Sequence, residues 1–155
     1  MNAPVSVHGS LIAYQGMGIL IVGPSGSFKT RLCVEAMMYG AKFIADDQVV
    51  LSLNMGMLMG GPRPGFQGVL ELRGVGLIKL PDAATQQVVS AVVELTPLEQ
   101  IERLPVAKET RDFLGVAVPV IRMASPPHSS GGVLLSAVKW VQEGRLLPSD
   151  WRPGA

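Results

Sequence analysis

The residues from Gly23 to Thr30 have the types and spacing best suited to bind phosphate. They read Gly-Pro-Ser-Gly-Ser-Phe-Lys-Thr, follow a predicted strand that ends at Val22, and open a predicted helix. This is the context of a phosphate-binding loop, whose free backbone N–H groups point at phosphate oxygens. The Lys29 ammonium would reach the outer phosphates, and the Thr30 hydroxyl would bind the Mg²⁺ that bridges them. The residues predicted to hold a nucleotide are Gly23, Pro24, Ser25, Gly26, Ser27, Phe28, Lys29 and Thr30.

One position departs from the usual pattern of such a loop, because Phe28 stands where a second glycine is expected. Glycine suits that position because it accepts a positive φ and lets the backbone approach the phosphate. A bulky residue held at positive φ costs about 1–3 kcal/mol. Either Phe28 bears this strain, or the loop follows another path. The alternative to a phosphate site is a glycine-rich turn with a stray lysine.

A pair of carboxylates, Asp46 and Asp47, follows a short predicted strand shortly after the loop. At the carboxyl edge of a strand, near bound phosphates, one carboxylate could hold Mg²⁺ and the other could accept a proton from an attacking hydroxyl. The alternative is a turn that begins with two aspartates. The residues alone do not assign the two roles.

The elements that must position these residues follow from hydrophobic periodicity and from turn residues. Two helices are expected, over 30–39 and 132–143, each followed by a glycine that ends it. The segment 54–65 is expected to be a loop, and part of the charged segment 99–112 is expected to be a mobile surface loop. This order predicts an α/β fold, a P-loop domain with a mixed sheet. The expected strands are 11–14, 18–22, 42–45, 49–53, 69–72, 88–95 and 118–123.

Composition limits the class of protein. The chain has 155 residues, of which 48% are hydrophobic and 16% are charged, so disorder is excluded and one domain over 1–155 is expected. A net charge of +1 without a basic run argues against nucleic-acid binding. The absence of a long apolar run and of a secretory signal predicts a cytoplasmic protein with no membrane contact. A mean hydropathy of +0.35 suggests apolar surface buried in a homo-oligomer.

Several segments together resemble the catalytic domain of bacterial HPr kinase/phosphorylase, from His8 to about Gly144. They are His8-Gly9, the phosphate loop, Ile44-Ala45-Asp46-Asp47 and the run from Gly68 to Ile78, with weaker matches later. The resemblance implies a P-loop fold related to phosphoenolpyruvate carboxykinase. It also implies transfer of the γ-phosphate of ATP to a serine of the phosphocarrier HPr, and in many members the reverse phosphorolysis.

The same resemblance implies roles for individual residues. Asp46 would be the base that deprotonates the target serine, His8 would lie near the phosphates, and Arg103 would supply positive charge to the transition state. Each has an ordinary alternative: an exposed residue near a terminus for His8, a surface charge for Arg103, and a solvated strand face for Glu71. The implied Mg²⁺ ligands are Thr30, Asp47 and Glu71.

The hypothesis from the sequence is therefore an ATP- and Mg²⁺-dependent protein-serine kinase that acts on an HPr-like phosphocarrier of the bacterial phosphotransferase system and regulates carbon or nitrogen metabolism. The alternative is a catalytically weakened regulator that binds a nucleotide or the phosphocarrier without turnover, as Phe28 suggests. A small-molecule kinase or carboxykinase relative is disfavoured, because 155 residues are few for the lid and the substrate domain that such enzymes carry. Two more departures from the family are expected: no separate N-terminal domain, and a segment 126–132 without the family's basic residues.

Overall fold

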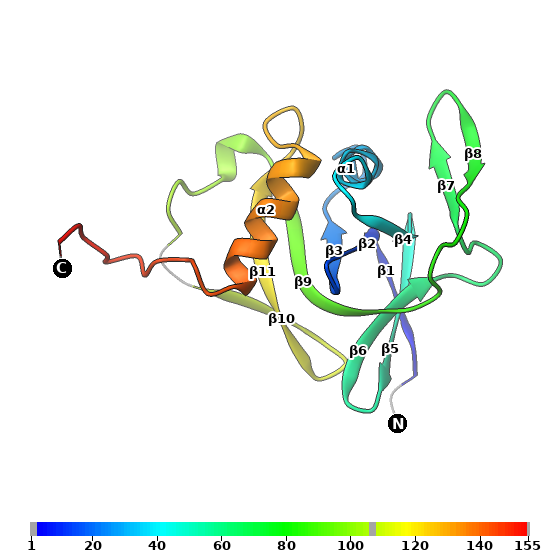
Figure 1. Ribbon diagram of the computed structural model, residues 1–155, viewed down its shortest axis with the longest axis horizontal. Helices are drawn as coiled ribbons and strands as arrows, with labels where there is room; N and C mark the ends of the chain where they lie inside the picture. Colours follow the sequence, from blue (N-terminus) through cyan, green and yellow to red (C-terminus); the bar gives the residue numbers. More distant parts are fainter. Residues whose placement is uncertain (1–2, 106–107, 155) are drawn as a thin grey trace.

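The computed structural model describes residues 3–105 and 108–154. They form mostly β-strands, with two α-helices (Figure 1). The helices are α1 (Lys29–Met37) and α2 (Gly131–Gln142), with a short 3-10 turn η1 at Leu98–Gln100. The strands are β1 (Val5–His8), β2 (Ser10–Tyr14), β3 (Met17–Val22), β4 (Lys42–Ala45), β5 (Gln48–Asn54), β6 (Met57–Pro62), β7 (Val69–Leu72), β8 (Gly76–Lys79), β9 (Gln87–Thr96), β10 (Glu109–Phe113) and β11 (Val116–Ala124).

The main sheet is organised around β9, the long bent strand in Figure 1. Strand β9 pairs parallel with β3 and with β11, and its first residues pair antiparallel with β6. The sheet continues antiparallel from β6 through β5 to β1, from β3 through β2 to β4, and from β11 to β10. It is therefore mixed, as the sequence predicted. The carboxyl ends of β3, β9 and β11 share one edge, which is where open α/β sheets bind ligands.

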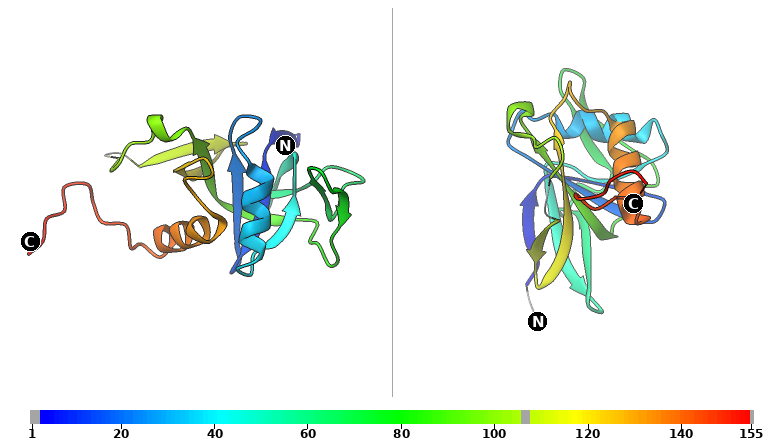
Figure 2. Two further views of the ribbon diagram at one scale, coloured as in Figure 1. Left: turned by 90° about the horizontal axis from the view of Figure 1, so that it is seen from above. Right: turned by 90° about the vertical axis from the view of Figure 1, so that its left-hand side faces the viewer.

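Both faces of the central strands are buried, so these strands read as continuous apolar runs. Successive side chains of β3 alternate between two cores: Ile19 and Ile21 face the helices, whereas Leu20 and Val22 face the β1–β5–β6 part of the sheet. Both helices lie on the first of these faces (Figure 2). The fully buried side chains that α1 and α2 place there are Leu32, Cys33, Ala36, Leu134 and Val138.

The ends of the two helices follow local chemistry. Helix α2 begins after Ser130, whose hydroxyl accepts a hydrogen bond from the backbone N–H of Val133. Gly40 and Gly144 both have positive φ just after the helices, as expected for residues that end a helix. Helix α1 begins directly at the end of the phosphate loop, with Phe28 as its N-cap and no side-chain cap.

Most predicted elements are confirmed, and the loop prediction for 54–65 is wrong. The segment 54–65 forms a tight turn and then β6, which pairs with β5. The segment 99–112 is irregular over 101–105, as expected for part of it, but its last residues belong to β10, which was not predicted and which pairs with β11. Strands β1 and β8 were not predicted. Within 3–105 and 108–154, no helix is long and apolar enough to span a membrane.

Candidate active site

The phosphate loop runs between the end of β3 and the start of α1, at the shared carboxyl edge of the parallel strands. Gly23 opens it with a φ of 159°, where an added Cβ would lie 3.1 Å from Leu95 Cβ and 3.0 Å from Ser27 Oγ. The Ser27 N–H donates to the Pro24 carbonyl at 3.1 Å, which closes the loop into a turn. The strand–loop–helix arrangement predicted from the sequence is therefore present.

Phe28 adopts the left-handed conformation that its position demands, with φ 67° and ψ 37°. Of the two alternatives that the sequence left open, the structure shows the first, a positive φ at Phe28. Its side chain is 54% exposed. The substitution therefore strains the backbone without burying the ring in the loop.

The Lys29 side chain is folded back into the loop. Its Nζ donates hydrogen bonds to the carbonyls of Gly23 at 2.9 Å and Pro24 at 3.0 Å, and to Ser27 Oγ at 3.3 Å. Burial lowers the pKa of Lys29 below its ordinary value, an effect that the carboxylates of Asp46 and Asp47 partly oppose. To contact a bound phosphate, the ammonium must exchange these carbonyl acceptors for phosphate oxygens, which are stronger partners.

Asp46 is held in place by two hydroxyl groups. Thr30 Oγ1 donates to its carboxylate, 3.1 Å from Oδ1 and 3.0 Å from Oδ2, and Ser10 Oγ donates to Oδ1 at 2.7 Å. The pairing of β2 with β4 places the buried Ser10 beside Asp46. Asp46 thus shares a site with the hydroxyl that the sequence assigned to Mg²⁺.

Asp47 faces a different set of groups. Its carboxylate lies 3.7 Å from His8 Nδ1 and 3.6 Å from Arg63 Nη2, and its side chain is 59% exposed. His8 arrives there because β1 pairs with β5, which places it opposite Gln48. The Arg63 guanidinium stacks over the Phe66 ring at 3.7 Å. Asp47 is therefore the accessible member of the carboxylate pair and lies between a histidine and an arginine.

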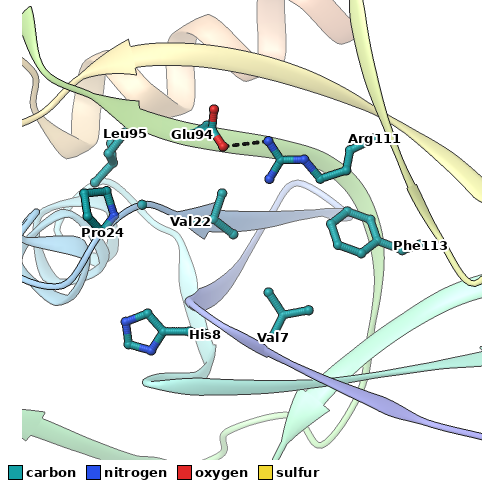
Figure 3. A pocket seen from close by; sticks show the side chains of 9 residues that line it. Val7, His8, Val22, Pro24, Glu94, Leu95, Arg111 and Phe113 are labelled. Carbon is teal, nitrogen blue, oxygen red and sulfur yellow. Dashed lines mark hydrogen bonds and ion pairs between the residues drawn. The ribbon is translucent and has the colours of Figure 1, made fainter.

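A cleft of about 370 Å³ opens beside the loop, lined by His8, by the loop residues Gly23 and Pro24, and by Arg111 (Figure 3). The Arg111 Nη2 lies 2.6 Å from Glu94 Oε1 on β9. Sequence reasoning missed both of these residues. One signal was available, since Glu94 is the single charge in an apolar strand, and a charge there needs a partner.

Two predicted site residues are exposed and belong to other segments of the chain. Glu71 is an exposed residue on β7, in the separate hairpin that β7 forms with β8. Arg103 is exposed in the segment after η1, next to residues 106–107, which lie outside the described part of the chain. Their roles stay predictions from the resemblance.

The hydroxyl and carboxylate oxygens of this site fit Mg²⁺ only together with the oxygens of a bound phosphate. Among the described residues, no three His, Cys, Asp or Glu side chains come together as a metal site. Mg²⁺ is commonly held by one or two carboxylates together with substrate phosphates and waters. The Thr30 hydroxyl and the Asp46 carboxylate, 3.0 Å apart beside the loop, match that kind of partial site.

Comparisons with known proteins agree with this geometry. Residues 1–139 match the family model described as HPr Serine kinase C-terminal domain. The chain is 33% identical over 142 residues to the HPr kinase/phosphorylase of Malacoplasma penetrans. The aligned region covers 85% of this chain and 47% of that protein. It is 31% identical over 142 residues to the HPr kinase/phosphorylase of Bordetella petrii, covering 85% and 46%. The chain thus spans about half the length of the curated relatives it matches.

A solved structure gives the same fold. The Hpr(Ser) kinase/phosphatase from Coxiella burnetii matches with a TM-score of 0.78 at 22% identity, covering 91% of this chain and 90% of that chain. This likeness confirms the predicted α/β fold with a mixed sheet. From the match over residues 1–139 and from relatives that are 33% and 31% identical, the chain belongs to the HPr serine kinase C-terminal domain family.

Proposed function

We propose that this chain is an ATP- and Mg²⁺-dependent protein kinase that phosphorylates a serine of an HPr-like phosphocarrier. The family and the names of the curated relatives support the class of reaction. One observation carries the proposal for this chain: two adjacent carboxylates beside a phosphate loop have different surroundings. Asp46 binds hydroxyl groups of the site, whereas Asp47 is open to an incoming substrate.

This difference favours the reverse of the roles that the resemblance implied, with Asp46 as the Mg²⁺ ligand and Asp47 as the base. Asp46, held by Thr30 and Ser10, would bind Mg²⁺ with the Thr30 hydroxyl. Asp47, more than half exposed and near His8, would accept the proton of the serine hydroxyl. A base must reach its substrate, and Asp46 has its oxygens engaged by two donors. We therefore assign proton transfer to Asp47.

The residues of the loop would bind and orient the nucleotide. Lys29 and the backbone N–H groups at the start of α1 would hold the phosphates. When bound, ATP supplies the phosphoryl group and Mg²⁺ neutralises its charge. As Asp47 takes the serine proton, a bond forms between the serine oxygen and the γ-phosphorus, and the bond from that phosphorus to the bridging oxygen breaks, which leaves ADP.

The two aspartates give a matched test with labelled ATP and purified HPr. The Asp47→Asn variant should lose at least about 100-fold in kcat, the usual contribution of a general base, with nucleotide affinity kept. The Asp46→Asn variant should instead bind nucleotide with weaker dependence on Mg²⁺ and lose activity for that reason. If Asp46→Asn keeps this Mg²⁺ dependence while Asp47→Asn keeps its turnover, the assignment is wrong.

A second candidate, a regulator that binds without turnover, is favoured by two observations. Phe28 strains the loop, and Lys29 binds the loop's own carbonyls. This candidate predicts that the nucleotide or the phosphocarrier binds while no label reaches serine. Turnover by the unmodified chain, abolished by Asp47→Asn, would exclude it.

A further inference from the structure

Ser10, the first residue of β2, is a fully buried polar side chain in an apolar part of the sheet. It lies opposite Ile21 of β3, and its side chain shares a face with Ile12, two residues further along its own strand. Both isoleucines belong to the core that the helices cover. A buried hydroxyl without a hydrogen-bond partner is costly. The place of Ser10 in this core therefore calls for a partner.

That partner is the carboxylate of Asp46. Ser10 Oγ donates to Asp46 Oδ1 at 2.7 Å, a short distance that is typical of a hydroxyl bound to a charged acceptor. The Cys33 thiol also borders the Ser10 hydroxyl, but sulfur is a weak acceptor. Because a hydroxyl has a single hydrogen to donate, the hydrogen of Ser10 goes to the carboxylate.

The two oxygens of the Asp46 carboxylate are unequally engaged. Oδ1 accepts from both Ser10 and Thr30, whereas Oδ2 accepts from Thr30 alone among the described residues. A carboxylate oxygen has about two acceptor positions, so Oδ1 is saturated and Oδ2 keeps a free one. Oδ2 is therefore the oxygen of Asp46 that can bind a further cation. Thr30 is itself assigned to Mg²⁺, so Ser10 is the donor to Asp46 that has no other task in the site.

Asp46 lies in a tight turn between β4 and β5. Its carbonyl accepts from the Gln48 N–H at 2.7 Å, and Asp47 between them has a φ of 67°. This turn fixes the backbone, whereas the hydrogen bonds from Ser10 and Thr30 orient the carboxylate. Rotation about the side-chain bonds would exchange the two oxygens. The hydroxyl of Ser10, held inside β2, opposes that rotation.

We propose that Ser10 is a positioning residue of the Mg²⁺ site, which holds Oδ1 of Asp46 so that Oδ2 stays available to the ion together with the Thr30 hydroxyl. Substitution of a residue that hydrogen-bonds a metal ligand typically changes metal affinity about 10–100-fold. This inference rests on the proposed function, in which Asp46 binds Mg²⁺. It adds that the site depends on a buried residue that touches neither the nucleotide nor the ion.

The experiment measures by calorimetry how the affinity of the full chain for a non-hydrolysable ATP analogue depends on Mg²⁺. The Mg²⁺ requirement is the concentration at which half of the gain in affinity is reached. In Ser10→Ala it should rise by about tenfold or more, while the affinity without Mg²⁺ stays the same. Ser10→Cys, which has a similar shape and a weaker donor, should fall between. An unchanged Mg²⁺ requirement in Ser10→Ala, or an equal loss of affinity with and without Mg²⁺, would overturn the proposal.

Two comparisons locate the effect on Asp46. In the Asp46→Asn background, Ser10→Ala should not change the Mg²⁺ requirement further, because the ligand that Ser10 positions is gone. The matched control is Thr96→Val, which also removes a buried hydroxyl, but one that donates to the backbone carbonyl of Glu94 at 3.3 Å. This variant should keep the Mg²⁺ requirement of the unmodified chain. The same rise in Thr96→Val, or an equal effect of Ser10→Ala in both backgrounds, would overturn the proposal.

The outcome does not depend on the kinase assay, because binding of the analogue needs no turnover. If the chain transfers no phosphate but Ser10→Ala raises the Mg²⁺ requirement, the proposed function fails and the positioning role stands. If Asp46→Asn raises that requirement and Ser10→Ala does not, the positioning role fails and the assignment of Asp46 stands. An unmodified chain whose affinity does not depend on Mg²⁺ would overturn both. Urea unfolding confirms that each variant is folded, and Ser10→Cys keeps the test available if Ser10→Ala is not.

Discussion

Phe28 combines a backbone conformation typical of glycine with a side chain that points largely into solvent. Its strain is therefore a property of the backbone, and removal of the ring alone should not relieve it. This separates two possible effects of Phe28: obstruction of the nucleotide by the ring, and backbone strain without obstruction. The exposed ring favours backbone strain without obstruction.

The first prediction concerns Phe28→Gly. The variant should be more stable by about 1 kcal/mol, because glycine adopts positive φ without the penalty of a Cβ. Its nucleotide affinity should change less than threefold, since the ring lies outside the loop. Phe28→Ala is the control, because it removes the ring and keeps the strained φ. Calorimetric titration and thermal unfolding measure both quantities, and a large gain in affinity for both variants would show that the ring obstructs the site.

The second prediction concerns Cys33, whose side chain is completely buried. Burial, with a smaller effect from Asp46, raises the pKa of this thiol to about 12. Because the native thiol is buried and stays protonated at pH 8, iodoacetamide should label it only when the chain unfolds. The native chain should therefore be labelled far more slowly than the chain unfolded in urea. The unfolded thiol ionises near 9.0, so stability should fall as pH rises from there towards 12. Labelling of the native chain at the rate of the urea-unfolded chain would contradict this.

The site residues show what a sequence can predict. Gly23 to Thr30, Asp46 and Asp47 could be predicted as site residues because each set is continuous in the sequence, so its pattern can be recognised without the fold. Arg111 and Glu94 were missed because β9 and β10 become neighbours only through β11. The division between Asp46 and Asp47 also needed the structure, since the two residues that distinguish them come from distant segments: Ser10 from β2 and Arg63 from the loop after β6.

At the scale of elements, α1 and α2 meet at a contact without room for a side chain. A Cβ added at Gly131, the first residue of α2, would lie 2.3 Å from the backbone N of Ala36. The Gly131 N–H also donates to Glu35 Oε1 at 3.0 Å. The start of α2 is therefore fixed against the backbone of α1, which follows the phosphate loop.

The third prediction tests this contact. Gly131→Ala should destabilise the protein by about 1–3 kcal/mol, the usual cost of overpacking, because the atom that it meets belongs to the backbone. The neighbouring Gly132→Ala is the control, since its Cβ would meet the Tyr39 ring at 3.2 Å, and that exposed side chain can move. Urea unfolding measures both. Equal losses for the two variants would contradict the argument.

The wrong prediction for 54–65 has a physical reason. Its glycines and methionines indicate a loop by composition, yet Gly60 and Gly61 serve close packing within β6. A Cβ at Gly60 would lie 2.6 Å from Leu11 Cδ2, and one at Gly61 would lie 2.3 Å from the Thr85 carbonyl oxygen. Glycine in a strand can mark the close approach of another segment, and that segment is invisible to local periodicity. Strand β9 was predicted correctly because its own run of valines carries the strand pattern, without reference to another segment.

At the scale of the whole molecule, large apolar side chains remain exposed on α2 and on the segment that follows it. Val133 and Trp140 on α2 are more than half exposed, as are Leu146 and Leu147. The segment after α2 extends away from the body (Figure 1). Exposed apolar surface of this kind is typical of interfaces between proteins.

The fourth prediction is that the chain forms a homo-oligomer through this surface. Sedimentation at micromolar concentration should give a mass above the 16.4 kDa of one chain. Trp140→Glu should lower that mass, because it places a charge in the interface, whereas the exposed Met55→Glu at the β5–β6 turn should not. A monomer at all concentrations would contradict the prediction.

The parallel pairing of β3 with β9 also has a consequence for the order in which the molecule acquires its activity. Strand β3 carries the phosphate loop at its end, and β9, which fixes β3 in the sheet, begins only at Gln87. Pairing of segments so distant in the chain is slow, because a long loop must close first. During synthesis, the complete loop sequence therefore leaves the ribosome well before the strand that supports it. A nascent chain that ends before Gln87 holds every loop residue but not the strand that supports the loop, so the proposed nucleotide site can form only after Thr96 has emerged.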